Sequence, residues 1–458
     1  MVFSSIIFIY YFLPLLLIIY FICPKKYRNL VLLLFSMLFY FYGEKTYIIL
    51  LLGSCFFNYI IGRLLGNKKK KSYLIIGVVV NLLLLMYFKY TNFFIDNFNS
   101  IFNLGINSLN VILPLGISFF TFQNLSYIID VYKGDVTCQK NFLNYSMYIS
   151  FFPQLVAGPI VRYKDINEEL ENREESYSLF SEGVTRFLVG LGKKVLIANT
   201  IFSMCTLLEG ITPSVIGYWL LGIGYTLNIY FDFSGYSDMA IGLGRMFGFK
   251  FLENFNYPLT ATSITDFWRR WHISLSSFFR DYVYIPLGGN RVSFIKMLRN
   301  IFVVWLLTGF WHGASWNFII WGLYFFIFLM IEKLFLLKHL NKKPFNHIYT
   351  MIIVIISFII FNTTDLIKLG TILKGLVGIN TPLINFETIY YLKNYLIILI
   401  IALVGMTPFI RDLLEKLKKG KSKKIVDVLE IISFVIILIL VTASLISNSF
   451  NPFIYFRF

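Results

Sequence analysis

Long apolar runs, separated by short polar or charged stretches, extend along the whole chain. A helix needs about 20 apolar residues to cross the hydrocarbon core of a membrane. We therefore expect an all-α protein that crosses a membrane many times. Runs that are short or interrupted by Gly and Pro also fit re-entrant segments. The candidate helices are Ser4–Ile22, Leu30–Tyr42, Tyr47–Ile61, Tyr73–Phe88, Val111–Val131, Phe142–Val161, Val184–Leu207, Val215–Phe233, Ile301–Ile331, Ile348–Phe361, Ile389–Phe409 and Ile425–Ile446.

The composition agrees with a membrane protein. Of the 458 residues, 57% are hydrophobic and 14% are charged, whereas soluble domains carry about 25% charged residues. The net charge is +17, but the cationic residues occur in short clusters between the apolar runs. They do not form the basic face of a nucleic-acid-binding domain, so we expect membrane lipids and not nucleic acid as partners.

Three basic clusters predict how the chain is oriented: Lys25–Arg28, Lys68–Lys71 and Arg411–Lys424. Cytoplasmic loops of membrane proteins are enriched in Lys and Arg. With these clusters in the cytoplasm, the N-terminus lies outside and the run Ile425–Ile446 leads outward. We therefore predict a multi-pass protein of the cell membrane, with both termini, including the short tail 447–458, on the extracytoplasmic side.

The stretch Thr262–Arg291 is too highly charged for a lipid-facing helix. A charged side chain at the centre of a bilayer costs about 2.5–3.5 kcal/mol on the insertion scale, so we expect this stretch at an interface or enclosed by other helices. Within it, Asp266 can pair with Arg269 or Arg270 at helical spacing. The alternative is an amphipathic helix on the cytoplasmic side, with arginines that meet lipid phosphates.

The run Ile301–Ile331 contains no charged residue and one histidine, His312. It predicts either one long tilted helix or two elements broken near Gly309 and Gly313. Small residues beside His312 leave room for a slender ligand or for a closely packed helix. An imidazole inside a membrane is a functional candidate, and the alternative is a hydrogen bond between helices.

Two of the four histidines, His272 and His312, are candidates for acid–base chemistry. The others, His339 and His347, lie in a basic stretch and are expected to be solvated. A desolvated imidazole stays neutral near pH 7 and can accept a proton from a hydroxyl group. Neither candidate belongs to an HExxH or paired-cysteine pattern, so we expect no bound metal.

Four long motifs carry a resemblance to a known family. The chain resembles the membrane-bound O-acyltransferase (MBOAT) family, and within it the membrane subunits of bacterial alginate and cell-surface polysaccharide O-acetylation. The resemblance implies one transmembrane domain over residues 1–458, built as a ring of about eleven tilted helices with re-entrant segments around a central funnel. The motifs are FFPQLVAGPIVRY (Phe151–Tyr163), FDFSGYSDMAIGLGRMFGF (Phe231–Phe249), NFNYPLTATSITDFWRRWHISLSSFFRDYVYIPLGGNR (Asn254–Arg291) and TGFWHGASWNFIIWG (Thr308–Gly322).

The resemblance also implies a membrane O-acetyltransferase. His312 corresponds to the catalytic histidine of the family and His272 to its second histidine. The acyl donor is then cytoplasmic acetyl-CoA, a substrate and not a bound cofactor, and the acetyl group passes outward to a polysaccharide of the alginate, cellulose or exopolysaccharide type. The residues expected to bind the donor or support the site are Trp268, Arg269, Arg270, Arg280, Trp311, Trp316 and Asn317.

The sequence NPFIYFRF contains Phe453, Tyr455 and Phe458 in an F-x-Y-x-x-F spacing. This spacing is similar to the terminal motif of acyl-exporting members of the family, and it implies that the Tyr455 hydroxyl relays the acyl group. The alternative is an aromatic anchor at the membrane interface. The implied partner is an extracytoplasmic SGNH-hydrolase-like acetyltransferase, together with polysaccharide synthase machinery.

Two other functions compete with polysaccharide O-acetylation. One is D-alanyl transfer to teichoic acids, for which a carrier protein supplies the acyl group. The other is a transporter or flippase without bond chemistry, which predicts paired charges along a pathway and inverted repeats. The sequence has no evident inverted repeat, and the wording of the Asn254–Arg291 motif favours the polysaccharide branch.

Overall fold

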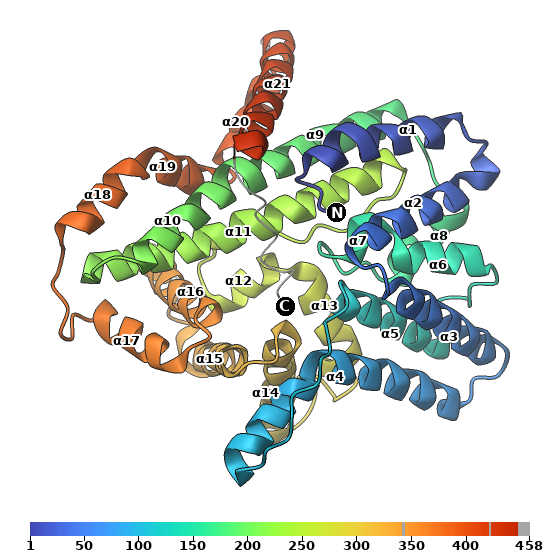
Figure 1. Ribbon diagram of the computed structural model, residues 1–458, viewed down its shortest axis with the longest axis horizontal. Helices are drawn as coiled ribbons and strands as arrows, with labels where there is room; N and C mark the ends of the chain where they lie inside the picture. Colours follow the sequence, from blue (N-terminus) through green and yellow to red (C-terminus); the bar gives the residue numbers. More distant parts are fainter. Residues whose placement is uncertain (341–343, 421–422, 448–458) are drawn as a thin grey trace. The chain divides into compact units, whose positions relative to one another are not determined.

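The computed structural model describes residues 1–340, 344–420 and 423–447 (Figure 1). Among these residues the regular structure is helical and no strand is present, so the predicted all-α class is confirmed. The chain forms two compact units. The first contains Met1–Phe187 and Ser237–Leu252, and the second contains Leu188–Tyr236 and the described residues from Glu253 onward.

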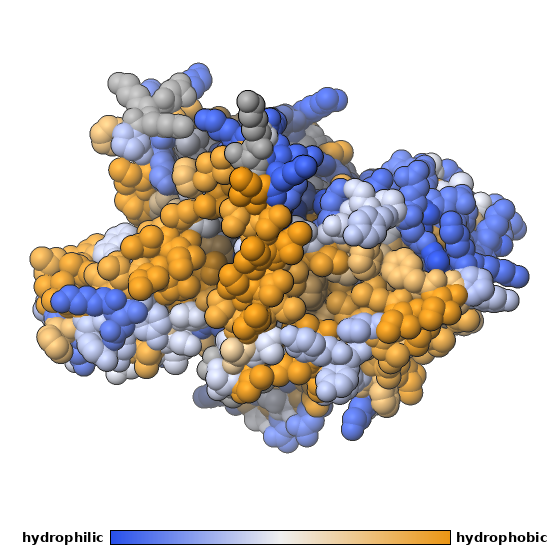
Figure 2. Space-filling view, turned by 90° about the horizontal axis from the view of Figure 1, so that it is seen from above, coloured by the Kyte–Doolittle hydropathy of each residue, from blue (hydrophilic) through white to orange (hydrophobic). Residues whose placement is uncertain are grey.

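Seven described helices are long and apolar enough to cross a membrane. An eighth span results if two helices bent by 59°, Phe386–Asn394 and Leu396–Gly405, cross together, and Phe8–Ile22 is a shorter apolar helix. Hydrophobic residues also cover much of the face shown in Figure 2. The multi-pass prediction is therefore confirmed, while the total of about eleven spans stays a prediction. The seven helices are Ile48–Asn67, Lys71–Phe102, Tyr177–Glu209, Phe294–His312, Trp316–Leu336, Phe345–Asn362 and Lys423–Ser447.

The first unit packs its N-terminal helices around a cluster of phenylalanine rings. Phe3, Phe8, Phe12, Phe39 and Phe152 are buried, with ring centroids 5.0 to 6.1 Å apart. Such aromatic contacts add to the stabilisation that apolar burial provides. The helices of this unit are α1 (Leu13–Ile22), α2 (Arg28–Gly43), α3 (Ile48–Asn67), α4 (Lys71–Phe102), α5 (Ile117–Lys133), α6 (Phe142–Ser150), α7 (Phe152–Leu155), α8 (Tyr163–Glu171) and the first part of α9 (Tyr177–Gly192).

The run Phe142–Val161, expected as one helix, is broken in the structure. Helix α6 ends at Ser150, the one-turn helix α7 follows, and residues 156–162 are irregular. Pro153 lacks the N–H that would continue α6, and Gly158 has a φ of 107°, which is outside the helical range. The run therefore does not form one continuous helix, which leaves the alternative expected for runs interrupted by Gly and Pro: the segment is a short helix followed by a buried loop.

The second unit contains the two candidate histidines. It is built from the π-helical turn η3 (Lys193–Ala198), α10 (Asn199–Glu209), most of α11 (Val215–Met246), α12 (Ile264–Arg270), α13 (Ile273–Phe279), η5 (Arg280–Tyr284), α14 (Phe294–His312), α15 (Trp316–Ile331), η6 (Glu332–Leu336), α16 (Phe345–Asn362), α17 (Leu366–Leu376), α18 (Phe386–Asn394), α19 (Leu396–Gly405), α20 (Phe409–Lys418) and α21 (Lys423–Ser447).

The run Ile301–Ile331 forms two helices, which was one of the two predicted alternatives. Helix α14 ends at His312, and α15 begins at Trp316 and lies beside it (Figure 1). The helices touch at glycines: a Cβ added to Gly309 would lie 2.4 Å from the carbonyl oxygen of Phe318, and one added to Gly322 would lie 2.4 Å from that of Trp305. These positions therefore require glycine, and the close contact fixes α15 against the end of α14.

A buried ion pair, Lys194 with Asp232, joins η3 to α11 in the second unit. The side chains are 3% and 1% exposed. Removal of one partner of a buried ion pair costs about 3–5 kcal/mol, so we expect Lys194→Met to lower the free energy of unfolding by this order. Thermal unfolding of the detergent-solubilised protein measures this loss.

Two controls test whether the pair itself is responsible. The double variant Lys194→Met, Asp232→Leu removes both charges and is expected to recover most of the stability. Lys368→Met breaks an ion pair with Glu209 whose side chains are 48% and 36% exposed, and it is expected to have little effect. Equal losses from Lys194→Met and Lys368→Met would contradict the prediction.

Candidate active site

His272 lies between α12 and α13, in a turn held by a neighbouring segment. The backbone N–H of Asn256 donates to the carbonyl of Arg270 (2.9 Å), and the N–H of Ile273 donates to the carbonyl of Asn254 (3.0 Å). His272 itself has a φ of 45°, in the left-handed region that residues other than glycine seldom adopt. The two hydrogen bonds keep the chain in this conformation and turn the imidazole inward, where it is fully buried.

The hydrogen bonds of Asn254 define the tautomer of His272. The side-chain oxygen of Asn254 accepts from the backbone N–H of Ser274 (3.2 Å) and from the Ser274 hydroxyl (2.9 Å), and it lies 3.2 Å from Nδ1 of His272. A backbone N–H can only donate, so the atom that it meets is the amide oxygen. Nδ1 of His272 then carries the proton, which leaves Nε2 as the basic nitrogen.

Burial lowers the pKa of His272 to about 3, in a turn outside the helices long enough to cross a membrane. In the unfolded chain the pKa of a histidine is about 6.5, so the unfolded state binds the proton more readily. The contribution of the neutral His272 to the stability of the folded protein is therefore complete above pH 6.5 and is lost as the pH falls towards 3. Over this range the unfolding equilibrium constant changes by up to about tenfold per pH unit.

We expect the melting temperature of the detergent-solubilised protein to fall between about pH 7.5 and about pH 5. His272→Gln has no titrating group at this position, so its melting temperature should fall less over the same interval. The same pH dependence in both proteins would show that His272 does not contribute in this way.

His312 is the last residue of α14 and lies inside a cage of aromatic rings. It is 2% exposed. Its ring makes edge-to-face contacts with Trp311, Trp321 and Phe361, at centroid distances of 5.0, 4.9 and 5.2 Å. Helices α14, α15 and α16 each supply part of this cage, which surrounds the imidazole with apolar surface.

Trp311 lies next to both histidines. Its ring centroid is 5.0 Å from that of His312 and 6.0 Å from that of His272. The structure therefore brings together the two residues that the resemblance implies as catalytic, although they are 40 positions apart in the sequence. Phe233 of α11 makes an edge-to-face contact with the ring of His272, at a centroid distance of 4.7 Å.

Two buried indole groups near His312 have no hydrogen-bond partner among the described residues: Trp268 and Trp321. Their rings contact each other at 5.6 Å, and Trp321 contacts His312. An indole N–H is a donor only, and leaving a buried donor unpaired is unfavourable. These two groups are therefore suited to bind an acceptor atom of a ligand, such as a carbonyl oxygen.

Trp321 was not among the residues expected from the sequence, and the spacing along α15 could have identified it. Asn317, Trp321 and Phe325 are four residues apart, so they share one face of the helix, and all three are buried. Trp316, which was expected to support the site, lies at the start of α15 and is 50% exposed. Asn254 begins the Asn254–Arg291 motif, but only the fold shows that it contacts His272.

The side-chain NH₂ group of Asn317 donates to the backbone of α16 and not into the cage around His312. Its amide nitrogen donates to the carbonyl groups of Ile360 and Phe361, at 3.3 and 2.8 Å. These bonds engage the end of α16 and hold Phe361, whose ring contacts His312.

The three arginines expected near the donor lie around α12 and η5. Arg269 is exposed, and Arg270 pairs with Asp266 at 2.9 Å, which is one of the two pairings predicted from spacing. Arg280 pairs with Asp281 at 2.7 Å and is 60% exposed. Their charged groups are thus more accessible than the histidines and remain candidates for binding phosphate groups.

The remaining predicted positions differ in their surroundings. His339 is exposed, as expected, but Nδ1 of His347 lies 3.0 Å from the carbonyl oxygen of Ala261 and the residue is only partly exposed. The described ranges contain no group of three His, Cys, Asp or Glu residues able to hold a metal. Tyr455 lies outside the described residues.

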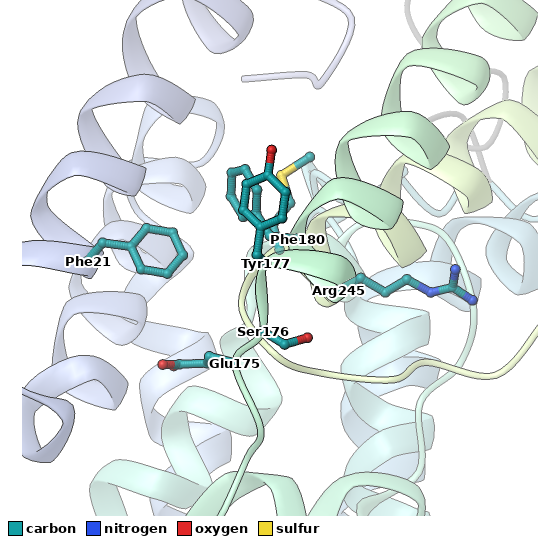
Figure 3. A pocket seen from close by; sticks show the side chains of 7 residues that line it. Phe21, Glu175, Ser176, Tyr177, Phe180 and Arg245 are labelled. Carbon is teal, nitrogen blue, oxygen red and sulfur yellow. The ribbon is translucent and has the colours of Figure 1, made fainter. Parts of the chain in front are cut away.

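A surface pocket in the first unit involves none of the predicted site residues. It has a volume of about 330 Å³. In Figure 3, Phe21 points across the opening towards Tyr177 and Phe180, while the guanidinium group of Arg245 extends away from it. Glu175, Ser176 and Met246 complete the lining.

Apolar helices and a buried pair of histidines define a multi-pass membrane protein with a candidate acid–base site. The sequence pattern of the membrane-bound O-acyltransferase (MBOAT) family matches residues 138–367, which is half of the chain. This range includes His272 and His312. The chain therefore belongs to the membrane-bound O-acyltransferase family.

Several known proteins are similar to the chain. It is 45% identical over 291 residues to the probable alginate O-acetylase AlgI of Pseudomonas aeruginosa, a match that covers 62% of this chain and 56% of the relative. It is 39% identical over 332 residues to the peptidoglycan O-acetyltransferase of Helicobacter pylori, covering 65% and 63%. It is 34% identical over 267 residues to the teichoic acid D-alanyltransferase of Bacillus subtilis, covering 54% and 67%. The chain thus spans little more than half the length of the alginate O-acetylase that it matches.

Proposed function

We propose that this protein is a membrane O-acetyltransferase that takes an acetyl group from cytoplasmic acetyl-CoA and passes it across the membrane for O-acetylation of an extracytoplasmic polysaccharide. The observation that carries the proposal is a buried imidazole, His312, whose ring contacts Trp321, which in turn contacts Trp268. The indole N–H groups of both tryptophans have no hydrogen-bond partner among the described residues. Acyl transfer to a hydroxyl requires a base and donors for an oxyanion. The similarity to two kinds of O-acetylating enzyme supports the same assignment.

In the proposed reaction, His312 takes the proton from the accepting hydroxyl group while the hydroxyl oxygen attacks the thioester carbonyl carbon. The carbonyl oxygen becomes negatively charged and accepts hydrogen bonds from the indole groups of Trp321 and Trp268. The tetrahedral intermediate then collapses, the carbon–sulfur bond breaks, and the thiolate of coenzyme A takes the proton from His312. The ester is formed and the imidazole is neutral again.

His272 is assigned to orienting the acyl donor. Its Nδ1 is held by Asn254, which directs the basic Nε2 away from that contact. It shares the neighbour Trp311 with His312, so a thioester between the two imidazoles contacts the same indole ring. The exposed Arg269 and Arg280 are assigned to the phosphate groups of the donor.

The acceptor side of the proposal depends on residues and partners beyond the described structure. Tyr455 is assigned as the acyl relay because of its F-x-Y-x-x-F spacing. An SGNH-hydrolase-like acetyltransferase outside the cell membrane would complete transfer to the polymer, next to polysaccharide synthase machinery. The basic clusters favour extracytoplasmic termini, which puts the tail on the side of this partner.

D-Alanyl transfer is the second candidate function, and the similarity to the Bacillus subtilis teichoic acid D-alanyltransferase favours it. The same base and oxyanion donors would serve that reaction, because it also transfers an acyl group to a hydroxyl. The two functions differ in the donor, which is a thioester of coenzyme A in one and of a carrier protein in the other.

An experiment with two labelled donors tests the proposal. Membrane vesicles that contain the protein are incubated with isotopically labelled acetyl-CoA or with a D-alanyl carrier protein, and surface polymers of a deletion strain are analysed by mass spectrometry in parallel. In the vesicles, we expect the labelled acetyl group to be transferred from acetyl-CoA. In the deletion strain, we expect the surface polymers to lose their O-acetyl groups. If label is transferred only from the D-alanyl carrier protein, and the teichoic acids of the deletion strain lack D-alanine, the second function replaces the proposal.

A further inference from the structure

Glu332 is a buried carboxylate that the proposed chemistry does not use. It is the first residue of η6, directly after α15, and it is 0% exposed. Burying a charged group is unfavourable unless hydrogen bonds replace its hydration. Glu332 accepts three: from the backbone N–H of Ile264 (2.5 Å), from the backbone N–H of Thr265 (2.9 Å) and from the Thr265 hydroxyl (2.8 Å).

These hydrogen bonds complete the first turn of α12. The N–H groups at the start of a helix have no partner within the helix. Ser263 caps one of them, since its hydroxyl accepts from the N–H of Asp266 (2.9 Å). Glu332 takes the other two from a position 67 and 68 residues further along the chain. Its negative charge also faces the positive end of the helix dipole.

The carboxylate therefore connects two helices that carry the indole groups of the site. Helix α12 carries Trp268, and α15 carries Trp321. The two rings contact each other at 5.6 Å, and Trp268 also contacts Phe325 of α15 at 4.9 Å. A shift of α12 relative to α15 would change the position of one indole N–H relative to the other.

We propose that Glu332 is a positioning residue for acyl transfer: its carboxylate clamps the first turn of α12 to α15 and thereby holds Trp268 against Trp321 beside His312. The clamp deepens the proposed function, on which its kinetic consequence rests. Its structural part, the link from Glu332 to the Trp268 ring, can be tested without assuming any reaction.

The variants separate the clamp from general folding. Glu332→Gln keeps the shape of the side chain but places an NH₂ donor where one carboxylate oxygen accepted a hydrogen bond. Thr265→Val removes only one of the three hydrogen bonds, so it is the milder variant and keeps the test available if Glu332→Gln does not fold. Glu415→Gln, at a side chain that is 63% exposed, is the matched control.

Two measurements report on the clamp itself. Hydrogen exchange measures protection of the Ile264 and Thr265 amides, and the ¹⁹F spectrum of protein labelled with 5-fluorotryptophan reports on Trp268, whose resonance is assigned by its loss in Trp268→Phe. In Glu332→Gln we expect exchange at these amides to rise about tenfold or more, since hydrogen bonds to charged groups are the stronger ones. The Trp268 resonance should move, with a smaller change in Thr265→Val and none in Glu415→Gln.

The third measurement is the steady-state rate of acetyl transfer. We expect kcat to fall about tenfold in Glu332→Gln while KM for the donor changes little, because an oxyanion contact acts in the transition state. Unchanged exchange and an unchanged Trp268 resonance would overturn the clamp. Faster exchange and a moved resonance with an unchanged kcat would overturn its role in positioning. Absence of acetyl transfer in the unaltered protein would instead count against the proposed function, while exchange and ¹⁹F spectra still decide whether the clamp exists.

Discussion

Replacement of His312 by alanine is expected to lower the rate of acetyl transfer by about 10²- to 10⁴-fold, the usual contribution of a general base. The reason is the burial of the imidazole within aromatic rings, where no solvent can substitute for it as a proton acceptor. Transfer from labelled acetyl-CoA in membrane vesicles measures the effect. The amount of protein in the membrane must be determined at the same time, because removing the ring also opens the cage.

His339→Ala is the matched control for this experiment. His339 is exposed, and its Nδ1 lies 3.0 Å from the carbonyl oxygen of Phe335 in its own helical turn, so its removal should leave the rate unchanged. If His312→Ala retains acetyl transfer at the level of the control, the catalytic assignment is wrong. Loss of transfer would at the same time exclude a transporter without bond chemistry.

The second large effect is expected from Trp321→Phe. Phenylalanine keeps an aromatic ring against His312 but has no N–H, so the variant removes one proposed oxyanion donor. Loss of one such donor lowers kcat by about 10²- to 10³-fold in enzymes of this type of chemistry. We expect a decrease of this order in kcat with little change in KM, measured with labelled acetyl-CoA, and a similar direction for Trp268→Phe.

A third tryptophan provides the control for these substitutions. The indole N–H of Trp219 donates to the carbonyl oxygen of Leu376 at 3.1 Å, and Trp219 is not part of the cage. Trp219→Phe therefore also loses an indole hydrogen bond, with an expected effect on stability and not on kcat. If Trp321→Phe and Trp268→Phe both behave like Trp219→Phe, the two rings serve only for packing.

The sequence predicted most helices because apolar runs of sufficient length leave few alternatives. It was less successful at their ends. Helix α4 continues to Phe102, well beyond the apolar run that ends at Phe88, and its last turns contain Asn and Asp residues that hydropathy does not favour. The hydrogen bonds of Asn92 and Asn99 to a following loop explain the extension, and such contacts are not visible in a hydropathy pattern.

For the site, the sequence predicted the two candidate histidines but not the residues that hydrogen-bond around them. His272 and His312 were found because histidine is rare in this chain and each lies in a long motif. Asn254 begins the same motif as His272, and Glu332 lies outside the quoted motifs, but neither was singled out, because an amide and a carboxylate acquire their roles only through the hydrogen bonds that the fold allows. Trp316 was expected at the site and Trp321 was not. Both tryptophans lie in the Thr308–Gly322 motif, but only Trp321 is buried in the structure.

The hairpin of α14 and α15 has a consequence for how the protein is made. It carries His312 and Trp321, and the contacts of Gly309 and Gly322 lie within it. A ribosome synthesises this hairpin as one continuous segment, so the imidazole and the indole beside it can meet during membrane insertion, before α16 delivers Phe361. Bulky residues at the two glycines should therefore act first on biogenesis: the hairpin would fail to close at the translocon, and the chain would be degraded before any acetyl transfer could be measured.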